Sequence, residues 1–117
     1  MTNYRVNQAG VRHAQKLIDS GAYDDSTEWS DTAPSADEEN RHIDQHGYDG
    51  YGEWHLALDQ EANDDTKSRY GFPFGDFSKV NRAALIHARQ RASQNNHDAV
   101  AKEAGRLLER LDAQREK

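Results

Sequence analysis

Apolar side chains recur at helical spacing near the start of the chain. One stripe with a period of about 3.6 residues contains Val11, Ala14, Leu17 and Ile18. Asn7 precedes this stripe and can cap a helix through its side-chain oxygen, and Gly21 follows it and can adopt a positive φ without strain. The pattern predicts a helix over residues 8–20.

Two further stripes of the same period occupy the C-terminal third. The first contains Val80, Ala84, Leu85, Ala88 and Ala92, and the second contains Val100, Ala104, Leu107, Leu108 and Leu111. We expect Asp76 or Ser78 to cap the first helix, and His97 or Asp98 to begin the second. The short connector at residues 94–96 predicts an antiparallel pair, and residues 113–117 are expected to fray.

The segment between these helical regions begins with an alternating pattern. Trp54, Leu56 and Leu58 alternate with less apolar residues, which predicts a strand with one buried face and His55 on the other. Asp64, Asp65 and Thr66 are expected to open a single helical turn before Gly71. Pro73 lacks an N–H group, so residues 72–75 should form an extended edge and not a helix.

Residues 22–52 contain few large apolar groups and many acidic ones. Such a stretch buries too little surface to offset the entropy of ordering it, so we expect an acidic, loop-rich insertion. One local signal stands out, because Ser35 and Glu38 have capping-box spacing and Gly47 can end a helix. This predicts a short polar helix over residues 36–46, followed by a loop at residues 48–52.

These elements define the expected fold class, which is α+β and mainly helical. An N-terminal helix and a C-terminal antiparallel helix pair should pack on a short strand pair, with the acidic segment partly ordered. The length of 117 residues predicts a single domain over residues 1–117.

Composition narrows the chemistry. The chain has no cysteine, which excludes disulfides, thiolate nucleophiles and cysteine-based metal sites. The first residues lack the apolar run of a signal peptide, and no stretch approaches the roughly 20 apolar residues of a membrane span. We therefore expect a cytoplasmic protein that does not enter the membrane.

The net charge of −6 is unevenly distributed. Residues 21–66 contain 14 acidic side chains and a single basic one, Arg41, whereas the segments on either side are mildly basic. The candidate acidic surface consists of Asp24, Asp25, Asp31, Asp37, Glu38 and Glu39. It can be a mobile, solubilising insertion, or it can bind a basic partner, and an ordered array of carboxylates can also imitate the phosphates of DNA.

Several short motifs give the chain a family resemblance. Trp54-His55-Leu56-Ala57-Leu58-Asp59, Lys67-Ser68-Arg69-Tyr70, Phe72-Pro73-Phe74-Gly75 and the Arg- and Ala-rich helix pair follow one another over residues 54–111. In this order they resemble a family of small uncharacterised bacterial proteins, some of them phage-associated. The resemblance implies a compact domain and brings no catalytic residues.

Two histidines form the candidate metal site. His42 and His46 are four residues apart and would share a helix face, with Glu38 and Glu39 one turn earlier, so that they could hold a divalent metal. Ile43 stands where a zinc protease needs its general base. The simpler interpretation is a solvated polar helix.

Candidate partner-binding residues come from the C-terminal half. An aromatic platform of Trp54, Tyr70, Phe72 and Phe74 could bind a ligand, although a chain this poor in apolar residues needs such side chains in its core. Arg82 and Arg89 lie seven residues apart on one side of a helix, where they could dock an acidic partner or the acidic segment itself. A solvated helix face is the simpler alternative.

No Ser–His–Asp arrangement, phosphate loop or cofactor motif is evident, so we expect no catalytic residues and no cofactor. The sequence favours a small non-enzymatic protein-interaction module. The alternatives are an acidic DNA mimic that inhibits a nucleic-acid enzyme, and a metal-binding protein. The expected partner is a protein or a second copy of the chain, because the net negative charge disfavours direct binding to nucleic acid.

Overall fold

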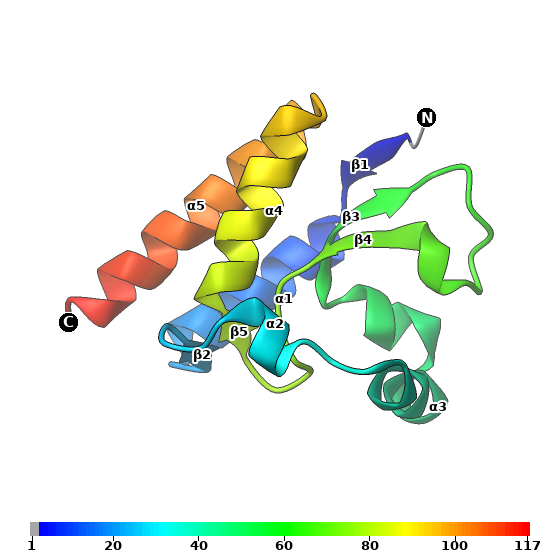
Figure 1. The fold of residues 1–117 in the computed structure, drawn as a ribbon, viewed down its shortest axis with the longest axis horizontal. Helices are drawn as coiled ribbons and strands as arrows, with labels where there is room; N and C mark the ends of the chain where they lie inside the picture. The colour runs from blue at the N-terminus through cyan, green and yellow to red at the C-terminus, as the bar shows by residue number, and fades with distance from the viewer. Residues whose placement is uncertain (1–2) are drawn as a thin grey trace.

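Helices α1, α3, α4 and α5 contact a small antiparallel sheet in the computed structural model, which describes residues 3–117 (Figure 1). Within this range the helices are α1 Gln8–Asp19, α2 Trp29–Thr32, α3 Ala36–Gly52, α4 Arg82–Gln94 and α5 Asp98–Arg115. The strands are β1 Tyr4–Val6, β2 Tyr23–Asp24, β3 His55–Asp59, β4 Tyr70–Pro73 and β5 Val80–Asn81, and the 3-10 turn η1 spans Lys67–Arg69. The fold is therefore α+β and mainly helical, as predicted.

The sheet has the strand order β1-β3-β4, and both strand pairs are antiparallel. Val6 is paired with Ala57, and His55 is paired with Pro73. The three residues of β1 are too few to show a period of two, so no pattern in the sequence predicted this strand. β2 and β5 form a separate parallel pair that ties the acidic segment to the start of α4.

The predicted N-terminal helix is confirmed as α1, but the expected role of Asn7 is wrong. The Asn7 side chain makes no capping bond. Its Nδ2 atom instead donates to the carbonyl oxygens of Gly52 and His55, at 2.8 and 3.0 Å. Asn7 is buried, so its amide joins α1 to the α3–β3 junction rather than closing the first turn of α1.

The antiparallel pair of α4 and α5 is confirmed, and the two helices lie side by side in Figure 1. Neither Asp76 nor Ser78 caps α4. The cap is Asn81, whose Oδ1 accepts from the amide of Ala84 at 2.8 Å. The start moves because Val80 and Asn81 extend to pair with β2, while Asp76 Oδ1 closes a turn by accepting from the amides of Ser78 and Lys79.

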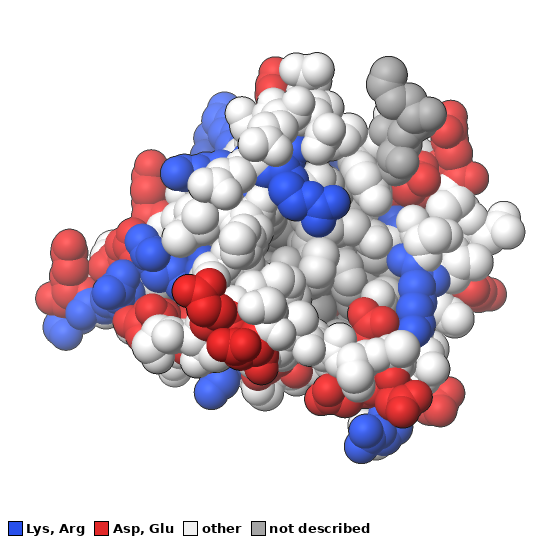
Figure 2. Space-filling view, viewed as in Figure 1, with Lys and Arg blue, Asp and Glu red and all other residues white. Residues whose placement is uncertain are grey.

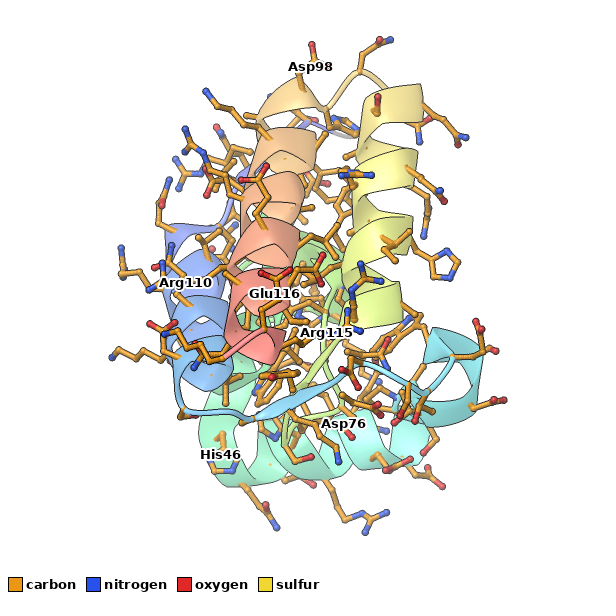
Figure 3. All side chains as sticks on the ribbon, turned by 90° about the vertical axis from the view of Figure 1, so that its left-hand side faces the viewer. His46, Asp76, Asp98, Arg110, Arg115 and Glu116 are labelled. Atoms are coloured by element: carbon orange, nitrogen blue, oxygen red, sulfur yellow. The ribbon has the colours of Figure 1, made fainter. Side chains whose placement is uncertain are left out.

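The end of α5 also differs from the expectation. The helix continues to Arg115, so the prediction that fraying begins at residue 113 is wrong. Arg115 Nε lies 2.8 Å from an Asp25 carboxylate oxygen, and Arg110 makes two hydrogen bonds to Asp19. Figure 3 shows both arginines on the last turns of α5. These pairs hold the helix end against α1 and the acidic segment.

The acidic segment is more regular than the sequence suggested. The Ser35–Glu38 capping box is confirmed and opens α3. Gly47 has a φ of 74° and interrupts this helix, but the chain re-enters helical conformation, so the loop expected at residues 48–52 is wrong. Tyr51 explains this outcome, because the second helical piece places its ring in the core.

The expected single buried face of β3 is also wrong, because both faces are covered. Leu56 and Ala57 are fully buried, and His55 is only 4% exposed. The ring of His55 packs against Tyr51 and Tyr70, at centroid distances of 4.6 and 5.8 Å. The end of α3 therefore covers the face that was expected to meet solvent.

Candidate functional site

Aromatic and imidazole rings from α1, α3, the turn after α3, β3, β4 and the loop after β4 form one continuous cluster. The members of this ring cluster are His13, His42, His46, Tyr51, Trp54, His55, Tyr70 and Phe77. Four of the six histidines of the chain thus meet in one place. The cluster lies where the acidic segment closes over the sheet.

His42 and His46 share a face of α3, as their spacing predicted, with ring centroids 4.5 Å apart. His42 stacks on Phe77 at 4.1 Å, and its Nε2 lies 3.3 Å from the carbonyl oxygen of Gly50. A carbonyl only accepts, so Nε2 carries the proton and donates. Burial lowers the pKa of His42, and the nearby charge of His46 lowers it further.

No third metal ligand joins this pair. Across residues 3–117, no group of three His, Cys, Asp or Glu side chains is placed to hold a metal ion. The Nε2 atom of His42 is also directed to a backbone carbonyl. Metal binding at His42 and His46 therefore remains a prediction that rests on two ligands.

Phe77 is a member of the cluster that the sequence suggested as a core anchor but not as a candidate site residue. Its φ of 71° lies in the left-handed region, which is unusual for an aromatic residue and costs on the order of 1–3 kcal/mol. The ring stacked on His42 and edge-on to Trp54 holds this conformation in place. Phe77 is only half-buried, so part of this ring stays accessible.

His55 and His13 are the more buried imidazoles of the cluster. His55 Nδ1 lies 3.0 Å from the Tyr51 carbonyl and must donate to it, so the neutral ring keeps a bare Nε2 acceptor. Burial lowers the pKa of His55 to about 4, although the bond to Tyr51 acts to raise it. The Nε2 atom of His13 is buried and has no hydrogen-bond partner among the described residues, and burial lowers the pKa of this ring too.

Glu39 connects the acidic segment to the cluster. One carboxylate oxygen accepts from the Tyr51 hydroxyl at 3.2 Å, and the other lies 3.3 Å from Lys67 Nζ. Burial raises the pKa of Tyr51, and the negative charge of Glu39 raises it further, so the phenol stays protonated as a donor. Of the six predicted surface carboxylates, Glu39 is the one that points into the ring cluster.

A small cavity of about 120 Å³ opens beside Glu39. It is lined by Trp29, Ala33, Pro34, Glu39, Trp54, His55, Pro73, Gly75 and Phe77. Trp54, His55 and Gly75 are buried and form its floor, whereas most of the other lining residues are half-buried and form its rim. We call it the tryptophan cavity, because both tryptophans of the chain line it.

The remaining predicted acidic residues divide into two groups. Asp24 and Asp25 have structural roles: Asp24 accepts from the nearby amides of Ser26 and Thr27, and Asp25 pairs with the distant Arg115. Asp31, Asp37 and Glu38 are exposed on α2 and the first turn of α3. Figure 2 shows acidic side chains gathered over these two helices, below a mostly uncharged centre.

The predicted partner-binding residues lie in different environments. Trp54, Phe72 and Phe74 are 5%, 9% and 0% exposed, so they serve the core and leave little surface for a partner. Tyr70 is half-buried in the ring cluster. Arg82 makes two hydrogen bonds to Asp112, whereas Arg89 is exposed on α4.

Comparison of the chain with family models, with curated proteins and with solved structures gives no significant match. The resemblance to small bacterial proteins therefore remains an expectation from the motifs of residues 54–111. Within the described part of the chain, none of the helices combines the length and apolar character that crossing a bilayer requires.

Proposed function

We propose that this chain is a small, non-enzymatic, cytoplasmic protein-interaction module that binds a basic partner through α2 and α3. The observation that carries the proposal is the ordered state of the acidic segment. Exposed carboxylates stand on helices that are anchored by the capping box, the β2–β5 pair and the Glu39–Tyr51 bond. Carboxylates with fixed spacing complement a basic surface better than a loose chain does, because less entropy is lost on binding.

A matched pair of variants tests this proposal. The first neutralises three exposed acids of the proposed face, Asp31→Asn, Asp37→Asn and Asp44→Asn, and the second removes the same charge elsewhere, Glu61→Gln, Glu109→Gln and Glu116→Gln. The probe is an alternating Lys-Gly peptide, titrated by calorimetry at low salt. We expect the first variant to bind about tenfold more weakly and the second to lose much less. Equal losses, or no binding by the natural chain, would contradict the proposal.

The helical placement of the carboxylates also favours the second candidate, an acidic DNA mimic. Such a mimic needs charges on rigid elements, and Asp37, Glu38 and Asp44 share one helical piece. A nonspecific DNA-binding protein distinguishes the two functions. If the chain displaces duplex DNA from that protein, and the variant at Asp31, Asp37 and Asp44 does not, the partner is a nucleic-acid enzyme.

A further inference from the structure

The tryptophan cavity has the wrong size for a cofactor and the right size for a single side chain. Pockets for small molecules usually start near about 300 Å³. A volume of about 120 Å³ corresponds to about four water molecules at about 30 Å³ each. The occupant must therefore be a slender group that enters from the half-exposed rim, as a side chain presented by another protein would.

The residues that line the cavity favour an occupant with a positive charge. Three aromatic rings line the cavity, from Trp29, Trp54 and Phe77, and aromatic faces attract cations. Its two titratable lining groups, Glu39 and His55, both offer acceptors: a carboxylate and the bare Nε2 of a neutral imidazole. No hydrogen bond to this Nε2 is found among residues 3–117. The Glu39 carboxylate would repel an anion in the cavity and attract a cation.

The residues around the cavity also favour a positively charged occupant. The half-exposed rim is built by Trp29 of α2, by Pro34 and by α3, the elements that carry the exposed carboxylates Asp31, Asp37 and Glu38. A basic chain that approaches this face meets the cavity among these acids. Lys67 of the protein itself already reaches Glu39, and this pair is about one-third exposed on both sides, so a competing ammonium group can replace it.

We propose that the tryptophan cavity receives a lysine side chain of the basic partner, held by the aromatic walls and the Glu39 carboxylate. This inference rests on the proposed function and names its central contact. Trp29 and Glu39 contribute the accessible recognition groups. Trp54 and His55 form the floor, and Lys67 competes for the carboxylate from outside.

Intrinsic fluorescence tests the site directly, because the chain has two tryptophans and both line the cavity. The probe is n-butylammonium, which reproduces the lysine side chain, and the neutral reference is n-butanol, both at constant ionic strength. We expect n-butylammonium to change the emission saturably and n-butanol not to do so. Equal responses to the two molecules would overturn the proposal.

Variants identify the groups that bind. Trp29→Ala and Glu39→Gln should each weaken n-butylammonium binding by about tenfold, whereas Trp29→Phe should keep most of it because an aromatic ring remains. Asp49→Asn on the same helix, an exposed carboxylate that does not line the cavity, serves as the matched control and should change n-butylammonium binding less than about twofold. Thermal melting by circular dichroism checks the fold of each variant. The assignment is wrong if folded Trp29→Phe binds as weakly as Trp29→Ala. It is also wrong if folded Glu39→Gln binds as tightly as the natural chain.

A substitution of Lys67 should have the opposite effect on binding. Lys67→Gln should strengthen binding, because it frees one Glu39 oxygen, and it should do so more than Lys79→Gln, an exposed lysine outside the cavity. Equal effects of the two lysine substitutions would mean that net charge alone explains the change in binding, and this would count against the site.

Titrations with the Lys-Gly peptide and with n-butylammonium separate the lysine site from the proposed function. If the Lys-Gly peptide binds equally well to the natural chain and to Trp29→Ala, the interaction module stands and the lysine site is overturned. If n-butylammonium binds but the peptide does not, the cavity site is supported and the proposed partner class is wrong.

Discussion

Burial of His55 makes the stability of the protein depend on pH. The pKa of this imidazole is about 4 in the folded chain and 6.5 in the unfolded chain, because the buried ring resists protonation. The unfolded state therefore binds more protons between these values. The stabilisation is complete above about pH 6.5 and is lost progressively as the pH falls toward 4. His13 and His42 act in the same direction.

We expect the free energy of unfolding to fall by about 2 kcal/mol between pH 7.5 and pH 5 from His55 alone. Urea unfolding monitored by fluorescence at several pH values measures this change. His55→Asn keeps a donor for the Tyr51 carbonyl but cannot titrate, so its stability should vary less over this range. The exposed His87→Asn is the control. Asp19, Asp24 and Asp112, whose pKa values are lowered, act below pH 3.8 and do not obscure the window.

At the scale of elements, α1 approaches β3 so closely that a glycine is required between them. A Cβ atom on Gly10 would overlap the carbonyl oxygen of His55, which is fixed backbone of the sheet. By contrast, a Cβ on Gly105 of α5 would make an ordinary contact with the Arg89 side chain at 3.6 Å. The same substitution should therefore have opposite effects in the two helices.

We predict that Gly10→Ala destabilises the protein by about 1–3 kcal/mol through overpacking, and that Gly105→Ala stabilises it by up to about 1 kcal/mol through helix propensity. Chemical denaturation of both variants gives the two values. A neutral Gly10→Ala variant would show that α1 can move away from β3 without loss.

The sequence predicted the elements that carry their own local signal. The stripes of α1, α4 and α5 and the Ser35–Glu38 capping box depend on residues within a few positions of one another, and all four were found. Asn7 was misjudged because its partners, the carbonyls of Gly52 and His55, lie 45 or more residues away in the chain. The start of α4 was misplaced because Val80 and Asn81 pair with the distant strand β2. Local reasoning has no access to such bonds.

The candidate site was predicted only in part, for the same reason. The spacing of His42 and His46 revealed their shared face, and the acidic composition revealed the charge of α2 and α3. The tryptophan cavity combines residues from 29 to 77, and Phe77 reaches it through a backbone conformation that no side-chain pattern indicates. A site of this kind exists only in the tertiary structure, where the acidic segment closes over the sheet.

At the scale of the whole molecule, the segments far apart in sequence are joined by charge as well as by packing. Arg115 near the C-terminal end of α5 pairs with Asp25, and Arg110 pairs with Asp19. Both pairs are exposed, so each contributes little to global stability. The Arg115–Asp25 pair joins the acidic segment to α5, and the Arg110–Asp19 pair joins α1 to α5.

We expect Arg115→Gln to leave the global unfolding free energy within about 1 kcal/mol of the natural value, while amide exchange at residues 22–27 becomes faster. Hydrogen exchange followed by NMR separates the two effects. Arg106→Gln, which removes a local pair with Glu103 within α5, is the control and should leave residues 22–27 unchanged. Protection that does not change in Arg115→Gln would assign the anchoring to β2 and β5 alone.

The dependence of early residues on late ones has a consequence for biosynthesis. Tyr23 pairs with Val80, and Asp19 receives its arginine from a residue 91 positions later. When α1 and the acidic segment have emerged from the ribosome, they therefore still lack the later residues that pair with them. The nascent polypeptide should remain open, with its carboxylates keeping it hydrated, until α5 leaves the exit tunnel and the molecule closes in one late step.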